Sequence, residues 1–183
     1  MNKRTPAYLV LKSAVLFLSL LCFYPLSATN PQKKEMKELN VKKVSLANVA
    51  VENIPALLDK EKVAFQSINT VNWKTFPYQP EVQFRIAHTD DAILVHYKVK
   101  EASVRAVAAG DNGAVWEDAC VEFFSIPAGD GIYYNVECNC AGILLIGAGA
   151  GRENREHAPQ EVMDKLQRWS SLGRQSFEER VGE

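Results

Sequence analysis

Residues 114–124 read AVWEDACVEFF, and this stretch decides the fold that the sequence predicts. From Ala119 onward the side chains alternate in character, as they do along a β-strand whose successive side chains point to opposite faces. Val121 and Phe123 share one face and are expected in the core. The stretch also carries four residues that a plain core strand would not contain: Trp116, Glu117, Asp118 and Glu122. We expect Asp118 to fix the loop before the strand and Glu117 to be solvated.

Strand patterns with short turns extend in both directions from this stretch. The predicted strands cover residues 82–88, 93–99, 119–126 and 132–140. Segments 53–61 and 160–169 have helical spacing, and 160–169 is expected to pack on a sheet edge. The glycine-rich run 147–151 resembles the start of a dinucleotide-binding turn, but that motif needs a further glycine where this chain has Arg152. The run is therefore expected to be a flexible loop. Short strands at this spacing predict an all-β fold, an antiparallel β-sandwich of immunoglobulin or jelly-roll type with short helical segments.

The strand 132–140 has two faces of opposite character. Its odd positions form a row of hydrogen-bonding side chains: Tyr133, Asn135, Glu137 and Asn139. Its even positions are apolar and are expected in the core. If this strand pairs with 119–126 as a hairpin, Glu122 lies near Asn135 or Glu137, since cross-strand neighbours stand about 5 Å apart. Trp116 then lies at the entrance to the polar side.

This combination suits a sugar, whose ring has an apolar face that covers an indole and a rim of hydroxyls. Carboxylates, amides and a guanidinium supply fixed partners for those hydroxyls. The candidate contacts are Trp116, Glu122, Asn135, Glu137 and Asn139, with Arg85 as the guanidinium from the polar side of its own strand. The alternative is a solvated outer sheet face with no ligand.

The first 28 residues have the parts of a secretory signal peptide. Lys3, Arg4 and Lys12 precede an apolar run that Tyr24-Pro25 interrupts, which is too short for a membrane span of roughly 20 residues. A lipid anchor on Cys22 is the less favoured alternative. We therefore expect a secreted, periplasmic or cell-surface protein, with a linker or first strand at 29–50 and one domain at 51–183.

Charge and cysteine usage exclude several functions. Removing residues 1–28 takes away three of the 21 basic residues and no acids, so the formal charge changes from −1 to −4. Without a basic cluster this balance argues against nucleic-acid binding. Cys120, Cys138 and Cys140 are expected as small buried hydrophobes, with a disulfide from Cys120 to either of the others as the alternative. No residues show zinc-site or EF-hand spacing.

The chain resembles a known family. The stretches VWEDACVEFF, YYNVECN and GAGAGR, with NWKTFPYQPEVQFRIAHTDDAILVHYKVKE upstream, are similar to carbohydrate-binding module family 9-like domains, above all the exported versions of gut Bacteroidetes. The likeness runs from about Ile54 to the C-terminus. It implies a β-sandwich that binds saccharides and is often attached to, or encoded with, glycoside hydrolases acting on polysaccharides.

The resemblance also implies roles for individual residues. In family members a tryptophan that matches Trp116 stacks on a sugar ring, and residues that match Glu122, Glu137 and Asn139 bind hydroxyls. The sugar binders hold the ring between two tryptophans, and the only later tryptophan here is Trp169. Members continue for several strands beyond the position of Glu183, so the resemblance implies a domain that is incomplete at its C-terminus. No cofactor is expected, although members sometimes hold structural calcium.

The sequence thus leads to a preferred function and two alternatives. The preferred one is a non-catalytic carbohydrate-binding domain that serves polysaccharide breakdown, with a poly- or oligosaccharide as partner. One alternative is a glycoside hydrolase or a hydrolase-associated domain, in which Glu122 and Glu137 are the two carboxylates. The other is a cell-surface assembly domain that has lost sugar binding.

Overall fold

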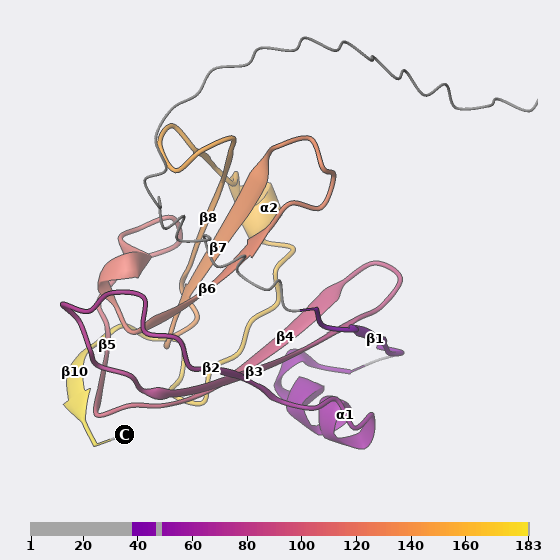
Figure 1. Ribbon diagram of the computed structural model, residues 1–183, viewed down its shortest axis with the longest axis horizontal. Coiled ribbons are helices and arrows are strands. Elements are labelled where there is room, and N and C mark those ends of the chain that lie inside the picture. The colour runs from indigo at the N-terminus through magenta and orange to yellow at the C-terminus, as the bar shows by residue number, and fades with distance from the viewer. Residues whose placement is uncertain (1–37, 47–48, 183) are drawn as a thin grey trace, which may run out of the picture. The chain divides into compact units, whose positions relative to one another are not determined.

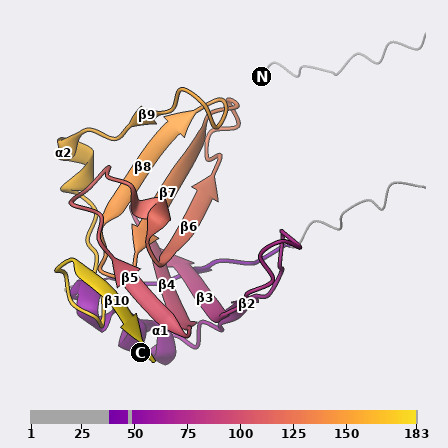
Figure 2. The same ribbon diagram turned by 90° about the vertical axis from the view of Figure 1, so that its left-hand side faces the viewer.

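Strands dominate the residues that the computed structural model describes, which are 38–46 and 49–182. They form an antiparallel β-sandwich with short helices (Figures 1 and 2), so the predicted fold class is confirmed. The expected signal peptide at 1–28 lies outside the described residues, as do residues 29–37 and 47–48 of the linker expected at 29–50. Within the described part of that linker, Lys42–Lys43 form the first strand, β1.

The first sheet is built around β3 (Glu81–His88). On one side β3 pairs along its whole length with β4 (Ile93–Lys100), from Glu81 opposite Lys100 to His88 opposite Ile93. On the other side it pairs with β2 (Gln66–Ile68) and, in the only parallel pairing among the described strands, with β1. The hairpin that the sequence predicted over these residues is confirmed.

A short helix covers the face of this hairpin that the sequence marked as polar. The 3₁₀ turn η1 (Val51–Asn53) leads into α1 (Ile54–Lys60), whose Leu58 is fully buried against Ala87 and Leu94. The alternation predicted that Val82, Phe84 and Ile86 would be the buried set. These three are only half-buried, whereas Arg85 and Ala87 on the opposite face are buried. Alternation identified the two faces correctly but not the face that the helix covers.

The second sheet has the order β6-β7-β8-β9. Strands β6 (Cys120–Ser125) and β7 (Tyr133–Asn139) form the predicted hairpin. Strand β8 (Leu144–Gly149) was not predicted, and it includes part of the run expected to be a flexible loop. Its Leu144-Leu145-Ile146 segment is apolar on both faces and buried on both, so it shows no alternation. Strand β9 (Glu156–His157) pairs with the glycine-rich end of β8.

The predicted helix at 160–169 is much shorter in the structure and uses a different face. Helix α2 spans Gln160–Met163 only. Met163 packs on a face of the sheet against Leu144 and Ile146 rather than at its edge. Val162 and Trp169, two of the three residues whose spacing suggested the helix, are exposed. After α2 the chain runs on to Arg168, which bonds to Asp111.

The remaining parts of the fold are a two-stranded sheet and a hydrogen bond between the two larger sheets. Strand β5 (Ser103–Ala106) pairs with β10 (Phe177–Val181). The 3₁₀ turn η2 (Val115–Glu117), between β5 and β6, packs on β6 and β7. The hydroxyl of Tyr97 on β4 donates to the backbone carbonyl of Glu122 on β6 at 3.2 Å, which joins the two larger sheets. Burial of that hydroxyl raises the pKa of Tyr97 to about 12, so it stays a donor throughout the neutral range.

Cys120, Cys138 and Cys140 form no disulfide in the structure. All three are partly buried, which agrees with the preferred prediction of small hydrophobic residues. Burial raises the pKa of Cys120 to about 12 and that of Cys140 to about 11. The thiols are therefore protonated and weakly nucleophilic at neutral pH.

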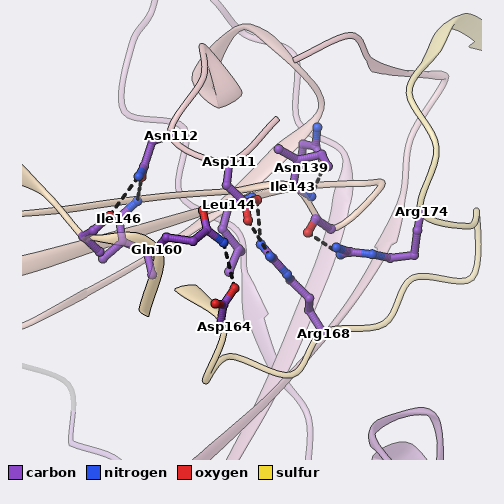
Figure 3. A network of polar contacts seen from close by, with 12 residues as sticks. Asp111, Asn112, Asn139, Ile143, Leu144, Ile146, Gln160, Asp164, Arg168 and Arg174 are labelled. Carbon is purple, nitrogen blue, oxygen red and sulfur yellow. Dashed lines mark hydrogen bonds and ion pairs between the residues drawn. The ribbon is translucent and has the colours of Figure 1, made fainter. Parts of the chain in front are cut away.

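Asp111 connects the segment after α2 to the second sheet (Figure 3). Its carboxylate accepts two bonds from the Arg168 guanidinium, at 2.7 and 2.5 Å, and one from the backbone N–H of Leu144 at 3.0 Å. Both side chains of the ion pair are only 18% exposed. Burial by itself would raise the pKa of Asp111, but the bonds from Arg168 and Leu144 outweigh it and lower the pKa. Neighbouring Asn112 bonds to Ile146 and Ala158, so the loop closes the edge of β8 where β9 ends.

We predict that Asp111→Ala lowers the free energy of unfolding by about 3 kcal/mol, because it leaves a largely buried guanidinium and a backbone N–H without partners. Urea denaturation followed by tryptophan fluorescence measures the loss. Asp164→Ala is the control, since Asp164 is exposed and bonds only to Gln160. It is expected to change stability by less than about 0.5 kcal/mol. Equal stability of the two variants would contradict the role assigned to Asp111.

Candidate functional site

The register of the second sheet brings most of the predicted site residues together. In an antiparallel pair, residues directly opposite each other point to the same face. Glu122 lies opposite Glu137, Phe124 opposite Asn135, and Cys120 opposite Asn139. We call the surface formed by Glu122, Asn135, Glu137 and Asn139 the polar face. The predicted proximity of Glu122 to Glu137 is therefore confirmed.

The polar face is more buried than its sequence suggested. The exposed fractions are 1% for Asn135, 5% for Glu137 and 3% for Asn139. The sequence placed these residues on an open face and the even-numbered residues of β7 in the core, whereas Tyr134 on the even side is 40% exposed. The cause is η2, which lies against β6 and β7 (Figure 2). Its buried Val115 packs on Leu145, which is the cross-strand partner of Glu137 on β8.

Asn135 and Glu137 form a buried pair with unused hydrogen-bonding capacity. The Asn135 amide nitrogen donates to one carboxylate oxygen of Glu137 at 2.6 Å. The other oxygen of Glu137 and the amide oxygen of Asn135 are buried and have no hydrogen-bond partner in the described part of the chain. A buried polar atom without a partner costs roughly 1–3 kcal/mol. Such atoms point to a place where a ligand or water supplies the missing donor.

Glu122 differs from Glu137 in that it is exposed. Partial burial raises the pKa of Glu122, and the charge of Glu137 raises it further. The charges of Arg155 and Arg152 oppose this effect without cancelling it. Glu122 is thus a carboxylate at the solvent side of the polar face, placed next to a second one.

Asn139 and Asp118 hold the covering loop in place. The Asp118 side chain has no exposed surface. It accepts bonds of 2.9 to 3.0 Å from the backbone N–H groups of Val107 and Ala108 and from the amide of Asn139. Burial would raise the pKa of Asp118, but these bonds and the charge of Arg105 lower it. The expectation that Asp118 fixes the loop is confirmed.

Asn139 also has its amide oxygen engaged. That oxygen accepts bonds from the backbone N–H groups of Ala141 and Ile143 at 3.1 and 2.8 Å. Both polar atoms of the Asn139 side chain therefore bind protein groups. Its observed role is to connect η2, through Asp118, to the turn between β7 and β8.

The structure does not bring Arg85 to the polar face. Arg85 lies on β3 in the other sheet and is 3% exposed. Its guanidinium donates to Asp59 at 2.6 Å and to the Pro55 carbonyl at 2.9 Å, and it lies 4.4 Å from the centre of the Phe65 ring. These contacts fasten α1 to β3. The sequence placed Arg85 correctly on its strand but could not show that α1 covers that side, so we leave Arg85 out of the proposed site.

Aromatic side chains border the polar face. Trp116 on η2 is 57% exposed, although Val115 before it is fully buried. Phe124 on β6 is also exposed, and its ring centre lies 6.0 Å from that of Tyr133. Both Phe124 and Tyr133 occupy positions on the site side of their strands. The sequence placed Tyr133 in the polar row of its strand, but neither residue was among the predicted sugar contacts.

Arg155, just before β9, is a further residue that sequence reasoning missed. It lies over Gly147 and Gly149 of β8, and its guanidinium is 6.0 Å from the centre of the Tyr133 ring. The two glycines were the available signal, since strand glycines mark a close approach of another group.

The described residues contain no group of three or more His, Cys, Asp or Glu placed to hold a metal ion. Among the same residues there is no helix long and apolar enough to cross a membrane.

Comparisons with known proteins identify the family of this chain. The model of carbohydrate-binding family 9 matches residues 52–183. The chain belongs to carbohydrate-binding family 9. A solved structure from Bacteroides uniformis ATCC 8492, described as a candidate carbohydrate-binding protein, is 62% identical to this family 9 chain, with a TM-score of 0.76. The match covers 79% of this chain and 66% of that one, so the chain spans about two thirds of that relative's length. A comparison with curated proteins found no match.

We predict that Asp118→Ala lowers the free energy of unfolding by about 2–4 kcal/mol, because it leaves two backbone N–H groups and the Asn139 amide without an acceptor. Asp118→Asn keeps one acceptor oxygen and is expected to lose less. The advantage of the wild type over Asp118→Asn should disappear as the pH falls through the lowered pKa of Asp118. Chemical denaturation at several pH values tests this, with the exposed Glu117→Ala as the control.

We also predict that Glu122→Gln is more stable than the wild type at neutral pH. The raised pKa means that Glu122 contributes stability below its unfolded pKa and that this contribution is lost as the pH rises through the folded pKa. The Tm of Glu122→Gln should therefore be higher by about 1–3 °C near pH 7 and equal to the wild type near pH 4. Added salt should reduce the difference, since Glu122 is exposed. A Tm difference that is the same at both pH values would argue against repulsion by Glu137.

Proposed function

We propose that this chain is an exported, non-catalytic carbohydrate-binding domain whose site is the polar face beside Trp116. One observation carries the proposal: two buried acceptor atoms, on Glu137 and Asn135, have no partner in the described protein and lie next to a second carboxylate, Glu122. Membership of carbohydrate-binding family 9 supports a saccharide as the ligand of this site.

The site residues have complementary tasks in this proposal. The exposed indole of Trp116 covers the apolar face of a sugar ring and gains from removing that surface from water. The ring hydroxyls donate to the unpartnered oxygens of Glu137 and Asn135 and to Glu122. Because Glu137 is buried and held by Asn135, its acceptor is fixed before the sugar arrives, which reduces the ordering cost of binding.

The protein's wider role is part of the same proposal. We infer that the segment at 1–28 directs export and that the domain serves polysaccharide breakdown beside a glycoside hydrolase.

We assign no catalytic role to Glu122 and Glu137. Retaining hydrolases place two carboxyl groups about 5–5.5 Å apart, and cross-strand neighbours stand at a similar distance. A chain that hydrolyses aryl glycosides, and loses that activity in Glu122→Gln, would overturn the non-catalytic assignment.

We predict that Trp116→Ala weakens saccharide binding at least tenfold and leaves the fold intact, because its side chain is mostly exposed. Affinity electrophoresis in gels that contain plant or host polysaccharides, preceded by a glycan array, measures the loss. Circular dichroism checks the fold. Trp73→Ala is the matched control, since Trp73 is 68% exposed but lies on the loop between β2 and β3.

The outcomes separate the possible functions. Binding that is lost in Trp116→Ala and kept in Trp73→Ala supports the proposed site. Binding that both variants keep places the ligand elsewhere. A wild type that binds no glycan overturns the proposal, and a protein partner captured equally by the wild type and Trp116→Ala would then identify an assembly domain.

A further inference from the structure

The path of the Arg155 side chain depends on the absence of two side chains on β8. A Cβ atom added to Gly147 would stand 3.3 Å from the Cβ of Arg155, and one added to Gly149 would stand 3.2 Å from its Cγ. Neither glycine has a positive φ, so the backbone does not require glycine there. What these positions provide is space, which Arg155 fills by lying flat across the strand.

This path leads Arg155 to the polar face. Gly147 is the cross-strand partner of Asn135, and Gly149 is the partner of Tyr133, so Arg155 crosses β8 on the same face as the buried pair. Its guanidinium lies 6.0 Å from the centre of the Tyr133 ring. Its charge also favours the ionised form of Glu122. Arg155 and η2 therefore flank the polar face from the β9 side and the loop side.

The guanidinium of Arg155 has unused hydrogen-bond donors. It carries five N–H donors, yet it makes no hydrogen bond or ion pair with any residue that the structure describes. By contrast, Arg85 and Arg168 bond to carboxylates, and Arg105 and Arg174 bond to backbone carbonyls. A half-buried arginine with unused donors thus shares a face with two buried acceptors that are also unused.

We propose that Arg155 is a ligand-binding residue of this site, which donates to a sugar hydroxyl beside the one that Glu137 or Asn135 binds. The inference rests on the proposed function and adds a residue to it. A hydroxyl both donates and accepts. One hydroxyl donates to Glu137 or Asn135, while it or its neighbour accepts from Arg155.

The test measures binding of the full chain to neutral xylo-, cello- and galacto-oligosaccharides, and to galacturonic acid and glucosamine oligomers, by calorimetry. We expect binding of at least one member of this panel and at least tenfold weaker binding by Arg155→Gln. Arg152→Gln is the matched control, because it removes the same charge from an exposed position on the same loop. It should remain within about threefold of the wild type.

A double-mutant cycle separates ligand contact from a structural role. Gly149→Ala forces the Arg155 side chain to shift by a few tenths of an ångström. It should weaken binding in the wild type but should have no further effect on binding in Arg155→Ala. Thermal denaturation of each variant controls for folding. Equal losses from Gly149→Ala in both backgrounds would contradict the inference.

The remaining outcomes are also decisive. Binding that depends on Trp116 but not on Arg155 overturns this inference and leaves the proposed function standing. A wild type that binds no member of the panel, and no glycan on an array, overturns both proposals.

Discussion

The buried carboxylate of Asp118 is the contact on which the arrangement of the site depends. It joins the backbone after β5, the start of β6 and the end of β7 through three hydrogen bonds. Only one residue of η2, Val115, is buried, so packing alone would hold this turn weakly against β7. The hydrogen bonds of Asp118 supply the additional restraint. The position of Trp116 and the burial of Glu137 both follow from the same loop. The buried, ionised carboxylate of Asp118 thus determines the position of Trp116 relative to the polar face.

Period-two alternation was sufficient to predict the two hairpins, their pairing and the proximity of Glu122 to Glu137. It failed where a segment is covered on both sides, since Leu144-Leu145-Ile146 has no polar face to alternate with. It also failed to show which face of a strand is covered, because α1 and η2 reach their strands through tertiary contacts. Arg85 and the polar face were misjudged for that reason.

Arg155 was not predicted, for a different reason. Its position depends on what two residues of another strand lack, and no local pattern around Arg155 reports that. The glycine-rich run was visible in the sequence, but its meaning required the β7-β8-β9 register. The sequence therefore predicted the carboxylates and amides of the candidate site but not Arg155 beside them.

The bond between Tyr97 and the carbonyl of Glu122 gives the site a connection to the opposite sheet. Among the strands that the structure describes, β6 is at the edge of its sheet, and one side of its backbone pairs with no other described strand. The tyrosine supplies a restraint there at the residue whose side chain lies on the polar face. The spacing between the two sheets is consequently transmitted to the position of Glu122. A substitution that changes this spacing would therefore shift the Glu122 carboxylate even where the fold stays intact.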